Sequence, residues 1–126
     1  MKKAGIMMAA ILICTGCAGM GKTQAPLNNK AKEMLASGIR HYEDGSYQET
    51  IADLQGALDT GLSSTSDQVK AHKYLAFTYC ISNRETLCRQ EFSKALAIDP
   101  KFDLAPAEAG HPMWGNVFRS VKKNFH

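Results

Sequence analysis

The sequence has little excess charge of either sign and no apolar run long enough to cross a bilayer. Of its 126 residues, 15 are Lys or Arg and 12 are Asp or Glu, which gives a formal net charge of +3. This balance gives no reason to expect nucleic acid as a partner. The one uninterrupted apolar run covers residues 4–13, about half of the roughly 20 residues that a membrane-spanning helix needs.

Residues that carry chemistry are few and scattered. The four histidines are not spaced like metal ligands. His41 and His72 lie in predicted helices, where we expect each to be packed in the core or to lie at its rim. No grouping of Ser, His and an acid is suggested by position, and no loop is long enough to assemble a pocket. We therefore expect no catalytic residue, no cofactor and no metal site, and hence a protein that is not an enzyme.

One pattern in the sequence is typical of nucleotide-binding proteins and argues against this expectation. Residues 16–23, GCAGMGKT, match the phosphate-loop pattern G-x-x-x-x-G-K-[ST] after an apolar run. The motif needs a helix that starts near Lys22, so that its backbone N–H groups meet the phosphates, and Pro26 interrupts that stretch. No later strand offers an acidic residue for Mg²⁺. We therefore expect no bound nucleotide.

The amino terminus has the features of an export signal. Lys2 and Lys3 precede the apolar run, whose length suits a signal peptide. The following CTGC at residues 14–17 resembles the lipobox of bacterial lipoproteins, although Cys14 stands where Leu is usual. The resemblance implies cleavage after residue 16 and acylation of Cys17, while Ala18 favours the periplasmic face of the outer membrane. The alternatives are an ordinary secretory signal or a short buried helix.

The rest of the chain divides into a tether and one helical domain. Residues 17–28 combine the lipidated Cys with a flexible tether of small and polar residues, and residues 29–126 form the domain. Apolar periodicity predicts helices from Asn28 or Asn29 to about residue 44, from Ser46 to residue 61, around residues 69–79, and from Asn83 to residue 98. Ser46 and Glu49 should form a capping box. A last helix should begin at Pro112.

The predicted hairpins repeat. When the sequence is shifted so that Gly38 falls on Ala76, Leu54 falls on Phe92, so that small residues allow close helix approach and large ones fill the space between units. This pattern resembles the tetratricopeptide repeat, with extra residues in the loop at 62–67. The resemblance implies an all-α fold of two tetratricopeptide-like hairpins, and the last helix, with Trp114 in the core, would cap them.

Two cysteines remain, because Cys14 would be removed with the signal peptide and Cys17 would be acylated. Cys80 ends one predicted helix and Cys88 lies in the first turns of its antiparallel partner, so their Cα atoms are expected within disulfide range. Beyond the inner membrane the compartment is oxidising. We expect a Cys80–Cys88 disulfide, and the alternative is two buried free thiols.

The repeat resemblance also implies a protein-binding groove along the first helix of each unit. Its apolar strip and the basic pair Lys70 and Lys73 would suit an amphipathic or acidic peptide. The alternative is a solvated helix face that also packs against the capping helix. The implied groove residues are Lys32, Leu35, Ile39, Tyr42 and Glu43 of the first unit and Lys70, Lys73, Phe77, Cys80 and Ile81 of the second.

The segment after the second unit narrows the resemblance. Residues 102–115, FDLAPAEAGHPMWG, together with Cys17, Cys80 and Cys88, resemble the TssQ-type lipoproteins associated with type VI secretion systems. That resemblance implies an accessory that binds another component of an envelope-spanning complex. The alternative is a pilotin-like adaptor that assists assembly of a pilus or secretin at the outer membrane.

Overall fold

The computed structural model describes residues 24–125, so the predicted signal peptide and Cys17 lie outside the described part of the chain. Within it the fold is all-α, as predicted, and none of its helices is long and apolar enough to cross a membrane. The helices are α1 (Gln24–Glu43), α2 (Tyr47–Thr60), α3 (Thr65–Ile81), α4 (Glu85–Ile98), α5 (Pro106–Ala109) and α6 (Gly115–Lys123).

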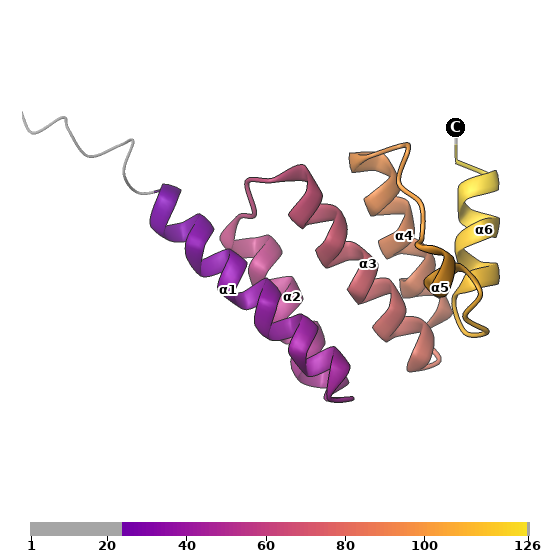
Figure 1. Ribbon diagram of the computed structural model, residues 1–126, viewed down its shortest axis with the longest axis horizontal. Helices are drawn as coiled ribbons and strands as arrows, with labels where there is room; N and C mark the ends of the chain where they lie inside the picture. Colours follow the sequence, from indigo (N-terminus) through magenta and orange to yellow (C-terminus); the bar gives the residue numbers. More distant parts are fainter. Residues whose placement is uncertain (1–23, 126) are drawn as a thin grey trace, which may run out of the picture.

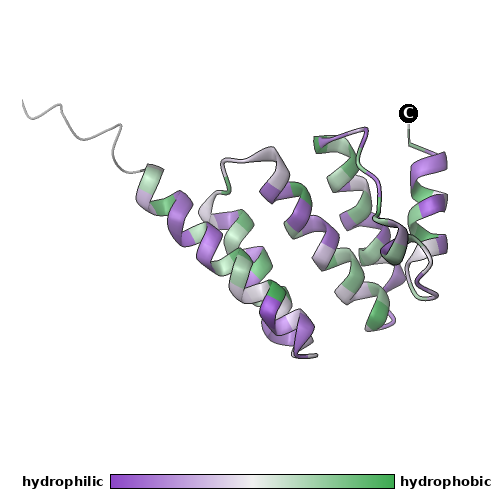
Figure 2. Ribbon diagram, in the orientation of Figure 1, coloured by the Kyte–Doolittle hydropathy of each residue, from purple (hydrophilic) through white to green (hydrophobic). Residues whose placement is uncertain are grey.

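Two antiparallel hairpins form the body, and α6 packs beside the second (Figure 1). The first hairpin is α1–α2 and the second is α3–α4. Hydrophobic and hydrophilic residues alternate along the helices (Figure 2), which is typical of helices that bury one face. The central helix α3 is the exception, because it is buried continuously from Leu75 to Cys80 between its neighbours.

Both hairpins turn in the same way, at equivalent positions of the repeat. Gly45 has φ 78° and Asn83 has φ 61°, the left-handed conformation that ends many helices. The next residue in each turn donates its N–H across the turn, from Ser46 to the carbonyl of His41 and from Arg84 to that of Tyr79, both at 2.8 Å. The alignment predicted from the sequence therefore holds for the backbone. Asn83 was predicted as a helix cap and forms the turn instead.

Close packing within the first hairpin also follows the prediction. A Cβ atom on Gly38 would lie 2.6 Å from Cδ2 of Leu54, so a larger residue would force the buried Leu54 side chain to shift. At the equivalent positions of the second hairpin, Ala76 and Phe92 are both fully buried. A small residue on the first helix and a large residue on the second helix thus set the distance between the two helices of a hairpin.

The predicted start of the first helix was wrong. It begins at Gln24, inside the predicted tether, and Pro26 occupies its first turn, where a missing N–H breaks no intrahelical bond. Asn28 was expected to cap the helix, but its side-chain oxygen accepts a hydrogen bond from the N–H of Ser63 at 3.1 Å. Residues 24–28, which were predicted to belong to the tether, are therefore part of α1.

Two further helix starts also differ from expectation. Ser46 occupies the cap position of α2, yet its side chain makes no capping hydrogen bond, and Thr50 Oγ1 donates to its carbonyl at 3.0 Å instead. The predicted capping box is absent from α2. The last helix begins at Gly115, three residues after Pro112, and the short helix α5 that precedes it was not predicted.

Candidate protein-binding face

The inner faces of α1 and α3 bring the predicted groove residues together in two groups. Leu35, Ile39 and Lys70 line one hollow between these helices. Tyr42 lies further along α1, and its ring is 6.2 Å from that of Phe77 on α3. Burial, with the neighbouring Tyr47, Tyr74 and Glu108, raises the pKa of Tyr42 to about 12.

The second group is covered by the chain itself. Residues 99–114, which we call the tail segment, connect α4 to α6 and run beside α3 (Figure 1). Trp114 stacks on Phe77 with ring centres 4.0 Å apart, and Glu108 accepts a hydrogen bond from Lys73 Nζ at 2.9 Å. Phe77 is consequently only 2% exposed. Phe77 and Lys73 thus pack against the tail segment, in line with the alternative that this helix face packs against the C-terminal cap.

Trp114 is the centre of this cover. It is buried, as predicted, and His111 stacks on it with ring centres 3.5 Å apart. Its Nε1–H donates to the carbonyl of Glu108 at 2.9 Å, which ties α5 to the indole. The sequence placed Trp114 in the core but carried no signal that Phe77 would be its partner, because that contact joins residues far apart in the chain.

The first group remains open. The hollow between α1 and α3 has a volume of about 260 Å³, and we call it the α1–α3 hollow. Lys32 and Lys70 are exposed at this hollow, Leu35 is buried beneath it, and Asp67 is its one acid. Its lining residues are Lys32, Leu35, Ala36, Ile39, Asp67 and Lys70.

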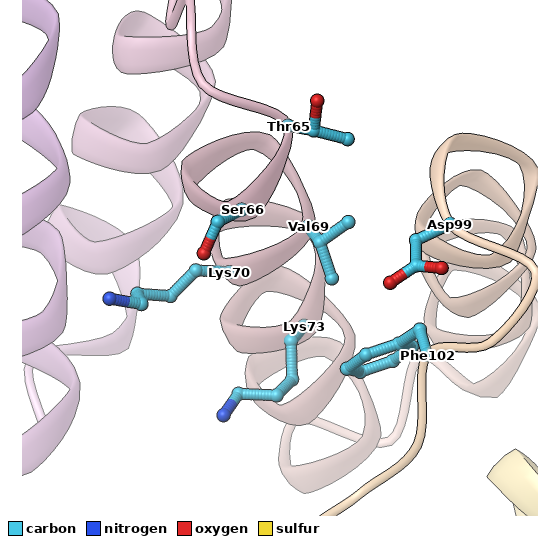
Figure 3. A pocket seen from close by; sticks show the side chains of 7 residues that line it. All are labelled: Thr65, Ser66, Val69, Lys70, Lys73, Asp99 and Phe102. Carbon is cyan, nitrogen blue, oxygen red and sulfur yellow. The ribbon is translucent and has the colours of Figure 1, made fainter.

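A second hollow adjoins it on the other side of α3. Val69, Lys73 and Phe102 face this space, and Lys70 extends toward α1 (Figure 3). Lys70 lines both hollows, so they adjoin at its side chain. Among the ion pairs between described residues, none involves Lys32 or Lys70.

The predicted disulfide is present. The sulfurs of Cys80 and Cys88 are bonded, with Cα atoms 5.2 Å apart, and both side chains are buried. The bond joins the last turn of α3 to the first turn of α4. It therefore fixes the closed end of the second hairpin, below the stack of Phe77 and Trp114.

A buried carboxylate that sequence reasoning missed lies away from the groove. Glu91 is 6% exposed, and its two oxygens contact His72 Nδ1 at 2.6 Å and Lys94 Nζ at 2.9 Å. Burial acts to raise the pKa of Glu91, but the hydrogen bonds from His72 and Lys94 outweigh it and hold the pKa below its usual value. His72 is thus a packed histidine, one of the two positions predicted for it.

The first hairpin holds an acid at the equivalent position. Asp53, which aligns with Glu91 in the repeat, accepts a hydrogen bond from Ser37 at 2.6 Å and lies 2.9 Å from His41 Nδ1. Each acid links the two helices of its hairpin. Among residues 24–125, no three His, Cys, Asp or Glu side chains are placed to hold a metal ion.

The described part of the chain is thus an all-helical domain of two matched hairpins, closed at one end by its own tail segment and open along part of its inner face. Comparison with known proteins adds no family to this class, because no family model, curated protein or solved structure matches the chain.

Proposed function

We propose that this protein is a membrane-anchored adaptor that binds a segment of another envelope protein in the α1–α3 hollow. The observation that carries the proposal is the difference between two equivalent surfaces. In the second hairpin, Lys73 and Phe77 are covered by Glu108 and Trp114. The equivalent residues of the first hairpin, Leu35 and Ile39, form the floor of a hollow whose rim residues Lys32, Ala36 and Lys70 are exposed.

The covered half indicates which chemistry the open half would accept. The tail segment offers α3 a carboxylate for a lysine and a ring for a buried apolar side chain. The open hollow offers Lys32 and Lys70 beside an aliphatic surface, against the single acid Asp67. A partner segment with acidic residues beside aliphatic or aromatic ones would complement both features.

The hollow favours binding over catalysis. It contains no histidine or cysteine, and the one carboxylate in it, Asp67, lies in the first turn of α3, where its N–H is capped by Ser64. Anchoring would come from acylated Cys17, since several acyl chains together hold a protein firmly at a bilayer. By resemblance to the TssQ-type lipoproteins, the partner would be another component of a type VI secretion complex.

Photo-crosslinking in intact cells tests this proposal. A photoreactive residue at Ala36, in the hollow, should capture an envelope protein that carries an acidic–apolar segment. The same residue at Ala52, which is exposed on α2 and lines neither hollow, is the matched control. The identity of the captured protein also distinguishes the type VI secretion role from the pilotin-like role, because a secretin or pilus component would favour the latter.

Charge reversal adds specificity to this experiment. Lys32→Glu combined with Lys70→Glu should abolish capture from Ala36, while Lys123→Glu on α6 should leave it unchanged. Equal capture from Ala36 and Ala52, or capture that survives the double reversal, would show that the hollow is not the binding site.

A further inference from the structure

We propose that the end of the molecule where α1 begins rests on the lipid surface, with Leu27 and the loop at residues 61–64 among the headgroups. This orientation rests on the acylation of Cys17 in the proposed function. It assigns the protein a second surface, distinct from the α1–α3 hollow, whose partner is the bilayer itself.

The short connection to the anchor confines this end. Six residues separate Cys17 from Gln24, the first residue of α1. Their seven Cα–Cα steps span at most about 25 Å when fully extended, and about 15 Å on average as a flexible chain. The helix itself has 20 residues and is about 30 Å long. The start of α1 therefore stays near the bilayer, whereas the far end is free to point away from it.

The surface at this end suits a lipid interface. Leu27 is 48% exposed and borders a hollow formed with residues 60–63. The hydrogen bond from Ser63 N–H to the Asn28 side chain joins the loop to α1, so Leu27 and the loop lie side by side. Residues 61–66, GLSSTS, carry no charge, and three of their hydroxyl-bearing residues are exposed. An apolar side chain beside neutral hydroxyl groups can enter the headgroup layer without a charge losing its water.

The opposite end of the body has the reverse character. The turns at Gly45 and Asn83 lie at that end (Figure 1), and the residues beside them are exposed and charged: Glu43, Asp44, Arg84 and Glu85. Contact with lipid there would strip water from several ionised groups, which is unfavourable. The length of the connection therefore selects the end where α1 begins, and the uncharged loop of residues 61–64 with Leu27 is the part of that end suited to the headgroups, between the exposed Lys30 and Asp59.

This orientation places the α1–α3 hollow close to the membrane. Lys32 lies eight residues into α1, about 12 Å along its axis, and Ile39 lies about 10 Å beyond it. A partner segment in the hollow would thus meet the protein within a few tens of Å of the bilayer, as a membrane-attached partner would.

Fluorophore depth in vesicles tests the orientation. The acylated protein, with Cys17 blocked and Cys80 bonded to Cys88, offers no other free thiol once the signal is removed. A dye on Ser63→Cys should shift its emission to the blue and be quenched by bromo-acyl lipids in phosphatidylethanolamine–phosphatidylglycerol vesicles. A dye on Thr86→Cys, an exposed residue at the opposite end, should show neither change.

Matched substitutions then test the apolar contact. Leu27→Gln should reduce quenching at residue 63 at least twofold, whereas Leu87→Gln, also an exposed leucine in a first helical turn but at the far end, should not. If the protein floats with the vesicles but residue 63 is quenched no more than residue 86, the orientation alone is overturned. A protein that does not float with vesicles overturns the anchoring, and the orientation with it.

Discussion

Replacing Trp114 by Ala tests whether the tail segment is an integral part of the fold. The indole is 5% exposed, lies between the rings of Phe77 and His111, and donates its one N–H to the carbonyl of Glu108. Truncation of a buried Trp to Ala removes its transfer free energy and leaves a cavity, a loss of about 3–5 kcal/mol. The free energy of unfolding of a domain is about 5–15 kcal/mol in total, so the Trp114→Ala variant should unfold at a much lower urea concentration.

Urea unfolding followed by far-ultraviolet circular dichroism measures this loss, because the variant has no other Trp to report by fluorescence. Met113→Ala is the matched control, since Met113 is 42% exposed and its truncation should change stability by no more than about 0.5 kcal/mol. Trp114→Phe retains a ring on Phe77 without the N–H, and should lose about 1–2 kcal/mol. A loss below about 1 kcal/mol for Trp114→Ala would refute the stack as a structural contact.

Three further perturbations have outcomes set by the structure. Reducing the Cys80–Cys88 bond, which closes a loop with sequence separation 8, should cost about 2–3 kcal/mol in urea unfolding, and oxidised and reduced intact masses should differ by the two hydrogens lost on bonding. Gly38→Ala should destabilise by about 1–3 kcal/mol, because its Cβ would overlap a leucine side chain, whereas Gly110→Ala, with nothing within 4 Å, should be near neutral. The lowered pKa of Glu91 means that, as pH falls, the unfolded chain takes up its proton first, so the stability it contributes is present above the unfolded pKa and is lost as pH falls through the folded pKa. Glu91→Gln should flatten that decline in urea unfolding measured as the pH is lowered below the unfolded pKa of 4.5, and an unchanged slope would contradict the lowered pKa.

The repeating features of the fold could be predicted because they are encoded locally. Gly38 precedes Leu54 by the same number of residues as Ala76 precedes Phe92. Gly45 ends its helix in a left-handed conformation that needs no distant contact. The disulfide could be predicted because the turn at Asn83 brings Cys80 and Cys88 together. Each of these predictions required only hairpin geometry.

The missed features depend on contacts that a local pattern does not contain. The first helix continues back to Gln24, and Asn28 inside it accepts a hydrogen bond from the distant Ser63 in place of a capping role. Phe77 was placed in a groove by the repeat resemblance, which marks an inward-facing position but does not specify that Trp114 would be the residue that packs on it. Glu91 was not singled out because the imidazole and ammonium groups that hydrogen-bond to it come partly from another helix.

The disulfide and the amino-terminal signal support the same location by independent routes. A buried bond between Cys80 and Cys88 forms and persists where the surroundings are oxidising, whereas the bacterial cytosol keeps such thiols reduced. The pattern of residues 1–17 predicts export from sequence alone and makes no reference to these two cysteines. Export would also remove Gly16, the first residue of the phosphate-loop pattern, so the reasoning that favours the lipid anchor argues against the nucleotide. If Cys17 is acylated as proposed, cysteine would have two roles in this chain: an anchor that precedes the first hairpin, and the Cys80–Cys88 bond that closes the second.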